Sequence, residues 1–248
     1  MTELLFLNDA YQRTCEATVK AVEAAEGGSS EGARASVVLD RTIFYYTGGG
    51  QPHDTGTISV GGLSFPVTEV RRRDGAIWHT VDVGDSTPPA VGDVVGCELD
   101  WNRRHDLMRT HTALHILCGV IWNEWGKSVT GGNMDRLSAR MDFEFDPLPE
   151  GFADRVTELV NAEIAADRPI EVSFLPRGQA VQDEELIRTK VNMIPESVQE
   201  IRVIDIVGLD KQADGGTHVR STAETGTFAI TRTESKGKGN KRVRIALT

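Results

Sequence analysis

The hydrophobic pattern of the chain changes its period near residue 100, and this change limits the possible folds. Upstream of it, apolar and polar residues alternate in short runs bounded by glycine, proline and aspartate, which is typical of β-strands. Downstream, residues 102–125 carry apolar side chains at the spacing of one helix face. A chain of 248 residues can form two domains. The pattern predicts a β-rich domain over residues 1–100 and a helix-containing domain over residues 101–248.

The first hundred residues contain candidate strands joined by tight turns. Residues 36–40 and 42–46 are rich in β-branched and aromatic side chains, and Gly61-Gly62 and Asp74-Gly75 are typical hairpin turns. Residues 14–25 fit either a strand, because their apolar positions alternate, or a helix, because they contain many alanines and glutamates. This series of short strands predicts a small β-barrel or β-sandwich.

The second part of the chain mixes long helices with strands. Gly126 ends the first predicted helix, and residues 151–167 form a second amphipathic pattern. The helices and strands do not strictly alternate, which favours an α+β fold with layered packing. Strands are predicted at residues 136–146, 170–175, 201–207 and 227–233, and a short helix at residues 180–188.

The composition excludes several classes of protein. The net charge of -10 opposes indiscriminate nucleic-acid binding, so an RNA partner would need a local basic surface. Cys15, Cys97 and Cys118 fit neither a disulfide framework nor a CxxC metal knuckle, and each is expected to be a small apolar residue. The N-terminus lacks a basic leader and the apolar runs are too short to span a bilayer. We expect a cytoplasmic protein with no membrane partner.

Two pairs of potential metal ligands stand far apart in the sequence. His111 and His115 are one turn apart on the apolar face of the predicted helix, so their imidazoles point the same way. Asp214 and His218 flank Gly215-Gly216, where glycine lets the backbone fold back. A buried histidine is usually satisfied by backbone or water, and the glycine turn alone is typical of a hairpin. All four side chains are nevertheless of types that zinc accepts, although the sequence does not show that they converge.

Three motifs in this order are typical of a known family. "TIFYYTGGGQPHDTG" is followed by "HTALH" at residues 111–115 and by "ADGGTHV" at residues 213–219. Over nearly its whole length the chain resembles the AlaX alanyl-tRNA editing proteins, of the medium-length class, and the editing domain of alanyl-tRNA synthetase. The resemblance implies a small β-barrel-like domain followed by a two-layer α/β editing domain with a mainly antiparallel sheet. It also implies a hydrolase that cleaves the ester between a wrong amino acid, serine or glycine, and tRNA(Ala).

The resemblance also assigns the metal ligands. The family's metal motif falls on His111, His115, Asp214 and His218, and implies one Zn²⁺ per chain. With three protein ligands and an open position, zinc would activate a water or polarise the ester carbonyl. With Asp214 as a fourth ligand, it would instead hold the substrate or shape the pocket, and direct catalysis would require a fifth coordination position. The family usually has cysteine at position 214, and aspartate is a harder ligand than thiolate. Asp214 is therefore either a metal ligand or a base that stays off the metal. We favour ligation, because the position matches the family's cysteine.

Further roles follow from the same resemblance. The glycine-rich loop is expected to pack against the editing pocket and to reject amino acids of the wrong size, through Gly49, Gly50, Gln51 and Asp54. Thr130 is expected to donate or accept a hydrogen bond with the hydroxyl of serine. A polar group in the pocket would discriminate against alanine, which would leave that group unpaired.

A basic segment near the C-terminus is the best candidate for binding RNA. Alternation of apolar and basic residues around a Gly-Asn turn predicts a basic hairpin. Such tips are often only solvated, but the resemblance favours contact with the phosphates of the tRNA acceptor end, and not with DNA. The RNA-binding candidates are Lys236, Lys238, Lys241, Arg242 and Arg244.

Two alternative functions remain open from the sequence. A metallohydrolase acting on a small ester or amide would use the same ligands without needing RNA. A nonhydrolytic tRNA-binding protein would have a site disabled by the aspartate at position 214. The basic hairpin favours an RNA partner and so argues against the first alternative. The sequence does not separate serine from glycine preference and does not indicate the oligomeric state.

Overall fold

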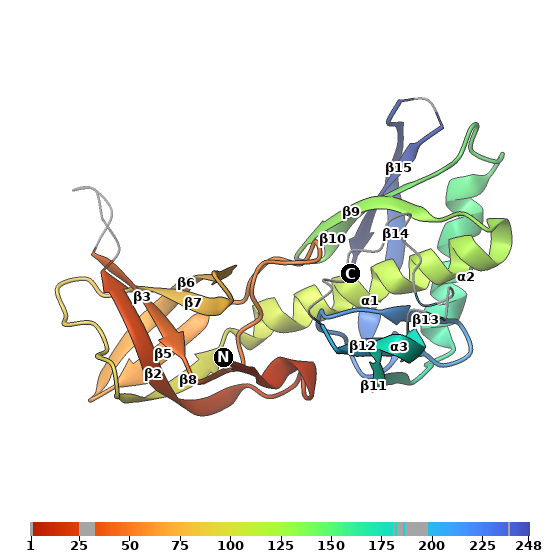
Figure 1. The fold of residues 1–248 in the computed structure, drawn as a ribbon. Coiled ribbons are helices and arrows are strands. Elements are labelled where there is room, and N and C mark those ends of the chain that lie inside the picture. Colours follow the sequence, from red (N-terminus) through yellow and green to blue (C-terminus); the bar gives the residue numbers. More distant parts are fainter. Residues whose placement is uncertain (1, 25–32, 181, 183–185, 187–197, 238) are drawn as a thin grey trace. The chain divides into compact units, whose positions relative to one another are not determined.

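The computed structural model describes residues 2–24, 33–180, 182, 186, 198–237 and 239–248 (Figure 1). The chain forms two compact units, Met1–His105 (unit 1) and Asp106–Thr248 (unit 2). Within these described ranges, no helix has both the length and the apolar character needed to cross a membrane.

Unit 1 is built on a closed β-barrel, which confirms the predicted fold class. Its strands follow the order β2-β3-β7-β6-β5-β8, and all neighbours that pair are antiparallel. Closure leaves no free edge on this sheet, and the inward side chains form one apolar core. The barrel strands are β2 (Thr14–Ala24), β3 (Arg34–Leu39), β5 (Gly56–Val60), β6 (Leu63–Arg73), β7 (Ala76–Asp82) and β8 (Val94–Leu99).

Both predicted hairpins of unit 1 are present. The Gly61-Gly62 turn has φ values of 59° and 83°, and the Asp74-Gly75 turn has φ values of 52° and 79°. Positive φ at both central residues matches the right-handed twist of the flanking strands, and glycine adopts it without strain. The ambiguous residues 14–24 are strand β2.

The predicted strand at residues 42–46 is wrong beyond its first residue. Besides the short strand β1 (Glu3–Leu4) and the 3₁₀ turn Leu5–Leu7, the structure has only β4 (Arg41–Thr42) in this region. Ile43 and Phe44 are fully buried in the barrel core. The N–H of Tyr45 donates to the Asp54 carboxylate. The segment is apolar because its side chains are buried. The backbone N–H of Tyr45 is hydrogen-bonded to a side chain and not to a neighbouring strand.

Unit 2 contains two antiparallel sheets and the helix α1 (Trp101–Trp125), which begins at the end of unit 1. One sheet has the order β14-β15-β10-β9, and the other has the order β11-β12-β13. Figure 1 shows α1 passing between the two sheets. The remaining elements are β9 (Val129–Asp135), β10 (Ser138–Phe143), α2 (Phe152–Ala165), β11 (Ile170–Pro176), α3 (Arg177–Ala180), β12 (Glu200–Ile206), β13 (Asp210–Ala213), the 3₁₀ turn Thr222–Thr225, β14 (Phe228–Ser235) and β15 (Lys241–Leu247).

Helix α1 is covered on several sides, and not along one stripe as the sequence predicts. Every residue from 110 to 120 is buried. On one side the helix packs in a core that includes Met141 and Val243 from the four-stranded sheet. On another side, Gly119 lets the start of β13 approach closely, since an added Cβ would lie 2.8 Å from Cβ of Asp210. This burial places the histidines of α1 in the interior of unit 2.

Several other expectations for unit 2 can be compared with the structure. Strands β10, β11, β12 and β14 and helix α2 form where they are predicted. Strands β9 and β13 are not predicted, because their sequences VTGGNMD and DKQA are rich in residues typical of turns. The predicted helix at residues 180–188 falls mostly outside the described residues.

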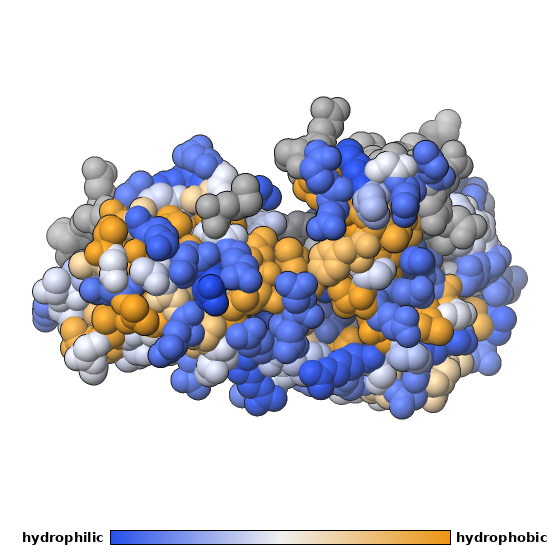
Figure 2. All heavy atoms as spheres, turned by 60° about the horizontal axis from the view of Figure 1, so that its bottom comes forward, coloured by the Kyte–Doolittle hydropathy of each residue, from blue (hydrophilic) through white to orange (hydrophobic). Residues whose placement is uncertain are grey.

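Hydrophobic side chains are also exposed on the surface (Figure 2). In unit 2 they belong to the three-stranded sheet and its continuation, whereas the four-stranded sheet carries charged side chains on its outer face. The large exposed hydrophobic residues among those described are Leu63, Val91, Val94, Val172, Phe174 and Val207.

Candidate metal centre

Two histidines of the centre are presented by α1. His111 and His115 are one helical turn apart, and their ring centroids are 5.0 Å apart. Both are buried, with 6% and 8% of their surface exposed. The i, i+4 spacing places both rings on the same side of the helix, as the sequence predicts.

The other two residues lie on the turn that follows β13. The N–H of Gly216 donates to the Asp214 carboxylate at 2.6 Å, which closes the turn on the aspartate side chain. Nη1 of Arg202, on β12, donates to the carbonyl oxygens of Asp214 at 3.0 Å and Gly216 at 2.8 Å. The turn is therefore held by hydrogen bonds from a buried guanidinium. An added Cβ at Gly215 would meet no atom within 4 Å, so the structure gives no steric reason for glycine there.

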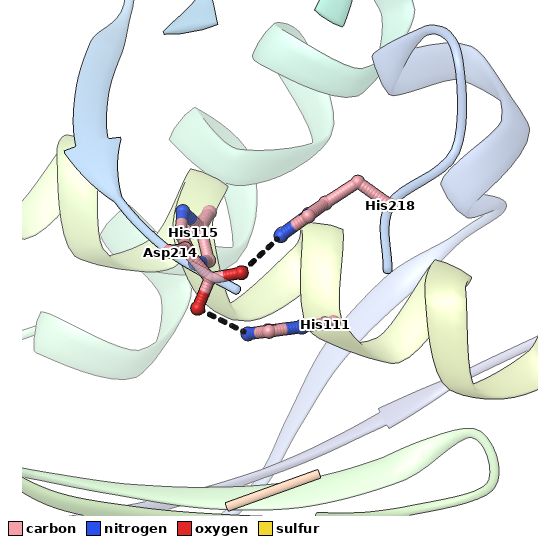
Figure 3. Close-up of side chains that lie close together, drawn as sticks. All are labelled: His111, His115, Asp214 and His218. Carbon is pink, nitrogen blue, oxygen red and sulfur yellow. Dashed lines mark hydrogen bonds and ion pairs between the residues drawn. The ribbon is translucent and has the colours of Figure 1, made fainter. Parts of the chain in front are cut away.

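The two pairs converge, which the sequence does not show. One ligand atom from each of His111, His115, Asp214 and His218 lies within 4.8 Å of all the others (Figure 3). Oδ2 of Asp214 is 3.1 Å from Nε2 of His218, and Oδ1 is 3.7 Å from Nε2 of His111. Tetrahedral zinc with ligands at about 2.1 Å needs ligand atoms roughly 3.4 Å apart, so small side-chain movements are enough. The donor set fits a metal ion such as zinc, but does not by itself select zinc.

The electrostatics of the cluster favour the forms that bind a metal. Burial lowers the pKa of His111, and burial together with the neighbouring His111 lowers the pKa of His115 to about 4. Burial and His111 also hold the pKa of His218 well below its ordinary value. Burial alone would raise the pKa of Asp214, but His111 and His218 outweigh it and the pKa lies well below its usual range. Neutral imidazoles and a carboxylate are the forms that metal ligands adopt near neutral pH.

Thr112 supports the centre from α1, and sequence analysis does not find it. Its hydroxyl oxygen lies 3.1 Å from Nδ1 of His218 and accepts the N–H of Val219 at 3.3 Å. A partner on Nδ1 orients the ring and leaves Nε2 to face Asp214. Thr112 lies within the HTALH motif, but a threonine in a helix gives no signal for this contact. Sequence analysis also misses Arg202, because its segment indicates only a buried β-strand.

Thr130 lies on β9 and is exposed. Its hydroxyl donates to Oδ1 of Asn240, in the turn between β14 and β15, at 3.1 Å. A contact between Thr130 and the hydroxyl of a substrate stays a prediction.

The basic residues predicted to bind RNA are at the end of the β14–β15 hairpin. Lys236 and Arg242 both donate to the carboxylate of Asp142. Arg244 donates to Glu234 at 2.9 Å. Nζ of Lys241 donates to the hydroxyl of Ser235 at 3.3 Å. Lys238 is outside the described residues. These contacts order the cations and leave the RNA-binding role a prediction.

The predicted glycine-rich loop belongs to unit 1. Gly48 and Gln51 form a small bridge with backbone hydrogen bonds in both directions, and Gly49 and Gly50 have positive φ values of 58° and 85°. Gln51 is buried.

Asp54, at the end of the same loop region, is fully buried. Nε of Arg104 donates to both of its carboxylate oxygens at 3.0 Å, and the N–H of Tyr45 donates at 2.6 Å. This pair accounts for Asp54 structurally, and a substrate contact would require the pair to open. Substrate roles for Gly49, Gly50, Gln51 and Asp54 stay predictions.

Comparison with known proteins covers the full chain. Residues 3–103 match the family model described as tRNA synthetases class II (A), and residues 201–244 match the model for the threonyl and alanyl tRNA synthetase second additional domain. The chain is 34% identical to alanyl-tRNA editing protein AlaX-M of Methanosarcina barkeri, over 100% of this chain and 99% of that protein. It is 36% identical to the protein of the same name from Saccharolobus solfataricus, over 98% of each chain. It is also 35% identical to the alanine–tRNA ligase of Pyrobaculum neutrophilum, over 96% of this chain but only 26% of the ligase.

Proposed function

The chain belongs to the family of alanyl-tRNA editing proteins named AlaX-M, and on this basis we propose that it hydrolyses tRNA(Ala) charged with the wrong amino acid. The proposed substrate is Ser-tRNA(Ala), with Gly-tRNA(Ala) as the second candidate. The convergence of His111, His115, Asp214 and His218 within 4.8 Å is the observation that carries the proposal. The names of the relatives support tRNA(Ala) as the substrate, and the four clustered side chains support a metal site at which hydrolysis takes place.

We propose that these four residues bind one Zn²⁺ ion. Bound zinc would supply Lewis acidity that makes a water more acidic or polarises the ester carbonyl, which with four protein ligands requires a fifth coordination position. Water adds across the acyl–oxygen bond, so that the free amino acid leaves as a carboxylate and the 3′-terminal ribose recovers its hydroxyl. The Asp214 carboxylate is proposed as a ligand, and it contributes negative charge that a neutral imidazole does not.

The remaining assignments are proposals of the same kind. Residues 101–248 are proposed as the editing domain and residues 1–100 as a β-barrel domain whose Gly49, Gly50 and Gln51 take part in substrate selection. Thr130 is proposed to recognise the serine hydroxyl. The basic β14–β15 hairpin is proposed to bind the acceptor end of tRNA(Ala).

Deacylation of charged tRNA tests the proposal directly. Purified protein would be incubated with tRNA(Ala) carrying serine, glycine or alanine, while metal content is measured on the same preparation. We expect release of serine or glycine to be much faster than release of alanine. His111→Ala should lose metal and hydrolysis together. His105→Gln, on the same helix, is the matched control and should retain both.

The same experiment separates the alternatives. A folded, metal-containing protein that releases neither serine nor glycine would exclude editing and favour a nonhydrolytic tRNA-binding protein. Hydrolysis of small esters without any activity on charged tRNA would favour a small-molecule metallohydrolase. Hydrolysis by a metal-free His111→Ala protein would exclude only the assignment of the ligands.

A further inference from the structure

The outer face of the four-stranded sheet carries a row of three arginines that crosses three strands. Arg232 on β14 pairs with Arg244 on β15, and Arg244 pairs with Arg140 on β10. Asn133 on β9 pairs with Arg140 and continues the row to the edge of the sheet. Directly paired residues share one face, about 4.5 to 5.5 Å apart between Cβ atoms. We refer to Arg140, Arg232 and Arg244 as the arginine row.

The arginine row places like charges directly opposite each other, and Glu234 and Asp142 offset only part of their repulsion. Like charges directly opposite each other on neighbouring strands destabilise a sheet. The alternate residues of β15, Val243, Ile245 and Leu247, are buried in the apolar core, so the core does not require cations at the intervening positions. Uncharged polar side chains at these exposed positions would also suit contact with solvent, and they would not repel one another. A polyanion that binds across the row would remove this repulsion.

Two carboxylates form ion pairs with the cations of this face but do not neutralise its positive charge. Glu234, Arg242 and Asp142 form the adjacent row in direct pairing. Glu234 lies 2.9 Å from Arg244 and 3.1 Å from Arg232.

Asp142 is almost fully buried and is shared by three cations. Its carboxylate oxygens lie 2.7 Å from Nε of Arg242, 2.7 Å from Nζ of Lys236 and 3.5 Å from Nη1 of Arg140. Arg140, Arg232, Arg242, Arg244 and Lys236 form ion pairs with Asp142 and Glu234, and Asp135 lies on the same face. Among the described residues, five cations therefore face three carboxylates, which leaves the face positive on a chain of net charge -10.

A groove lies beside two members of the arginine row, Arg140 and Arg244. It has a volume of about 300 Å³ and is lined by Asn133, Arg140, Thr231 and Arg244. Ser138 and Asp135 also line it, and Asp135 is the one carboxylate among its lining residues. Side chains of this kind donate several hydrogen bonds to anionic oxygens. Guanidinium groups match phosphate geometry better than any other side chain.

We propose that the arginine row binds the phosphate backbone of RNA. The proposal rests on the proposed function, which makes tRNA the partner, and it places the contact on the sheet face and not only at the tip of the basic hairpin. Arg140 and Arg232 are newly proposed RNA-binding residues. Arg244, which pairs with both, is already a candidate from the sequence. The buried Asp142 and the half-buried Glu234 hold the guanidinium groups in place, so binding needs less ordering of flexible side chains.

Binding of uncharged tRNA(Ala) tests the row without depending on hydrolysis. Dissociation constants of the full chain would be measured between 50 and 200 mM salt, roughly the range over which phosphate contacts change affinity strongly. Arg244→Gln should weaken binding by roughly tenfold, and the triple Arg140, Arg232 and Arg244 to Gln variant should weaken it further. The slope of log affinity against log salt should fall by roughly 0.7 to 0.9 for each lost phosphate contact.

Arg155→Gln is the matched control. Arg155 lies on α2, and its side chain is 46% exposed compared with 44% for Arg244. This control should bind tRNA with unchanged affinity and salt dependence. If the triple variant misfolds, as judged by its thermal melting, the single Arg244→Gln and Arg155→Gln pair gives the same comparison.

Three results would overturn the proposal. One is an arginine-row variant that binds tRNA with the affinity and salt slope of the unaltered protein. A second is equal weakening by Arg155→Gln, which would show a response to net charge alone. The third is weakened binding of poly-glutamate with unchanged RNA binding, which would indicate an acidic protein partner. If the unaltered protein binds tRNA(Ala) but hydrolyses neither Ser-tRNA(Ala) nor Gly-tRNA(Ala), only the proposed function would be contradicted.

Discussion

The hydroxyl oxygen of Thr112 lies 3.1 Å from Nδ1 of His218, although the two residues are 106 positions apart in the chain. When Nδ1 of His218 carries the proton and donates it to Thr112, Nε2 keeps a lone pair directed toward Asp214, 3.1 Å away. The Thr112 hydroxyl can pair with either tautomer, and with the proton on Nδ1 the short approach of Nε2 to Asp214 requires a cation between the two atoms. This tautomer is the one that can bind a metal in the cluster.

Thr112→Val should weaken metal binding by roughly 10- to 100-fold, because valine keeps the volume but removes the hydrogen-bond partner of Nδ1. Thr112→Ser should restore most of the affinity, since the hydroxyl returns. Titration of zinc against a competing chelator measures both. Equal zinc affinities for the valine variant and the unaltered protein would show that the hydroxyl does not select the tautomer.

Asp214→Cys should increase the preference of the centre for zinc over manganese by roughly tenfold or more, because thiolate is softer than carboxylate. Asp214→Asn should bind both metals less well, because it removes the negative charge. Affinities for the two ions, measured by chelator competition, give the comparison. If neither substitution changes them, Asp214 is not a ligand and acts off the metal.

Asp142→Asn should reduce the free energy of unfolding near neutral pH by about 1 to 2 kcal/mol, allowing for solvent screening of its partners. Hydrogen bonds from Arg242, opposed in part by burial, lower the pKa of Asp142 to about 2 from an ordinary value of 3.8. Because the folded-state pKa is depressed, this stabilisation is present above pH 3.8 and is lost as the pH falls toward 2.

Urea unfolding of the Asp142→Asn variant and the unaltered protein at several pH values measures the difference. It should be constant from pH 7 to about pH 5 and shrink below about pH 4. A difference that does not change over this acidic range would mean that Asp142 contributes no charge-dependent stability.

Gly119→Ala should destabilise the protein by about 1 to 3 kcal/mol, although alanine favours a helix over glycine by about 1 kcal/mol. The added Cβ would lie 2.8 Å from Cβ of Asp210 and 3.3 Å from Cγ of Leu209, so α1 and β13 would have to separate. Chemical unfolding measures the change. Gly178→Ala is the control, because an added Cβ there meets no atom within 4 Å. A Gly119→Ala protein as stable as the control would contradict the close packing of α1.

Sequence patterns predict the secondary structure best where burial has a regular period. The helix expected at residues 102–125 is α1, and the alternating residues of β10 and β15 face the core as expected. Prediction fails where the backbone is satisfied in another way, as at Tyr45, whose N–H is bound by Asp54. It also fails for β9, where Gly131-Gly132 indicates a turn but pairing with β10 imposes a strand.

The amino-acid sequence by itself determines which residues share a face. Neighbours along a helix or strand are related by a fixed period, so His111 and His115 point together, and Arg242 and Arg244 point away from the core, before any tertiary contact forms. Only the tertiary structure decides which faces meet. It brings Asp214 and His218 to the histidines of α1, places Thr112 behind His218, and aligns Arg140, Arg244 and Arg232 across three strands. These relationships depend on strand register and on the packing of α1 between two sheets, which arise from the sum of many weak contacts and leave no periodic signal in the sequence.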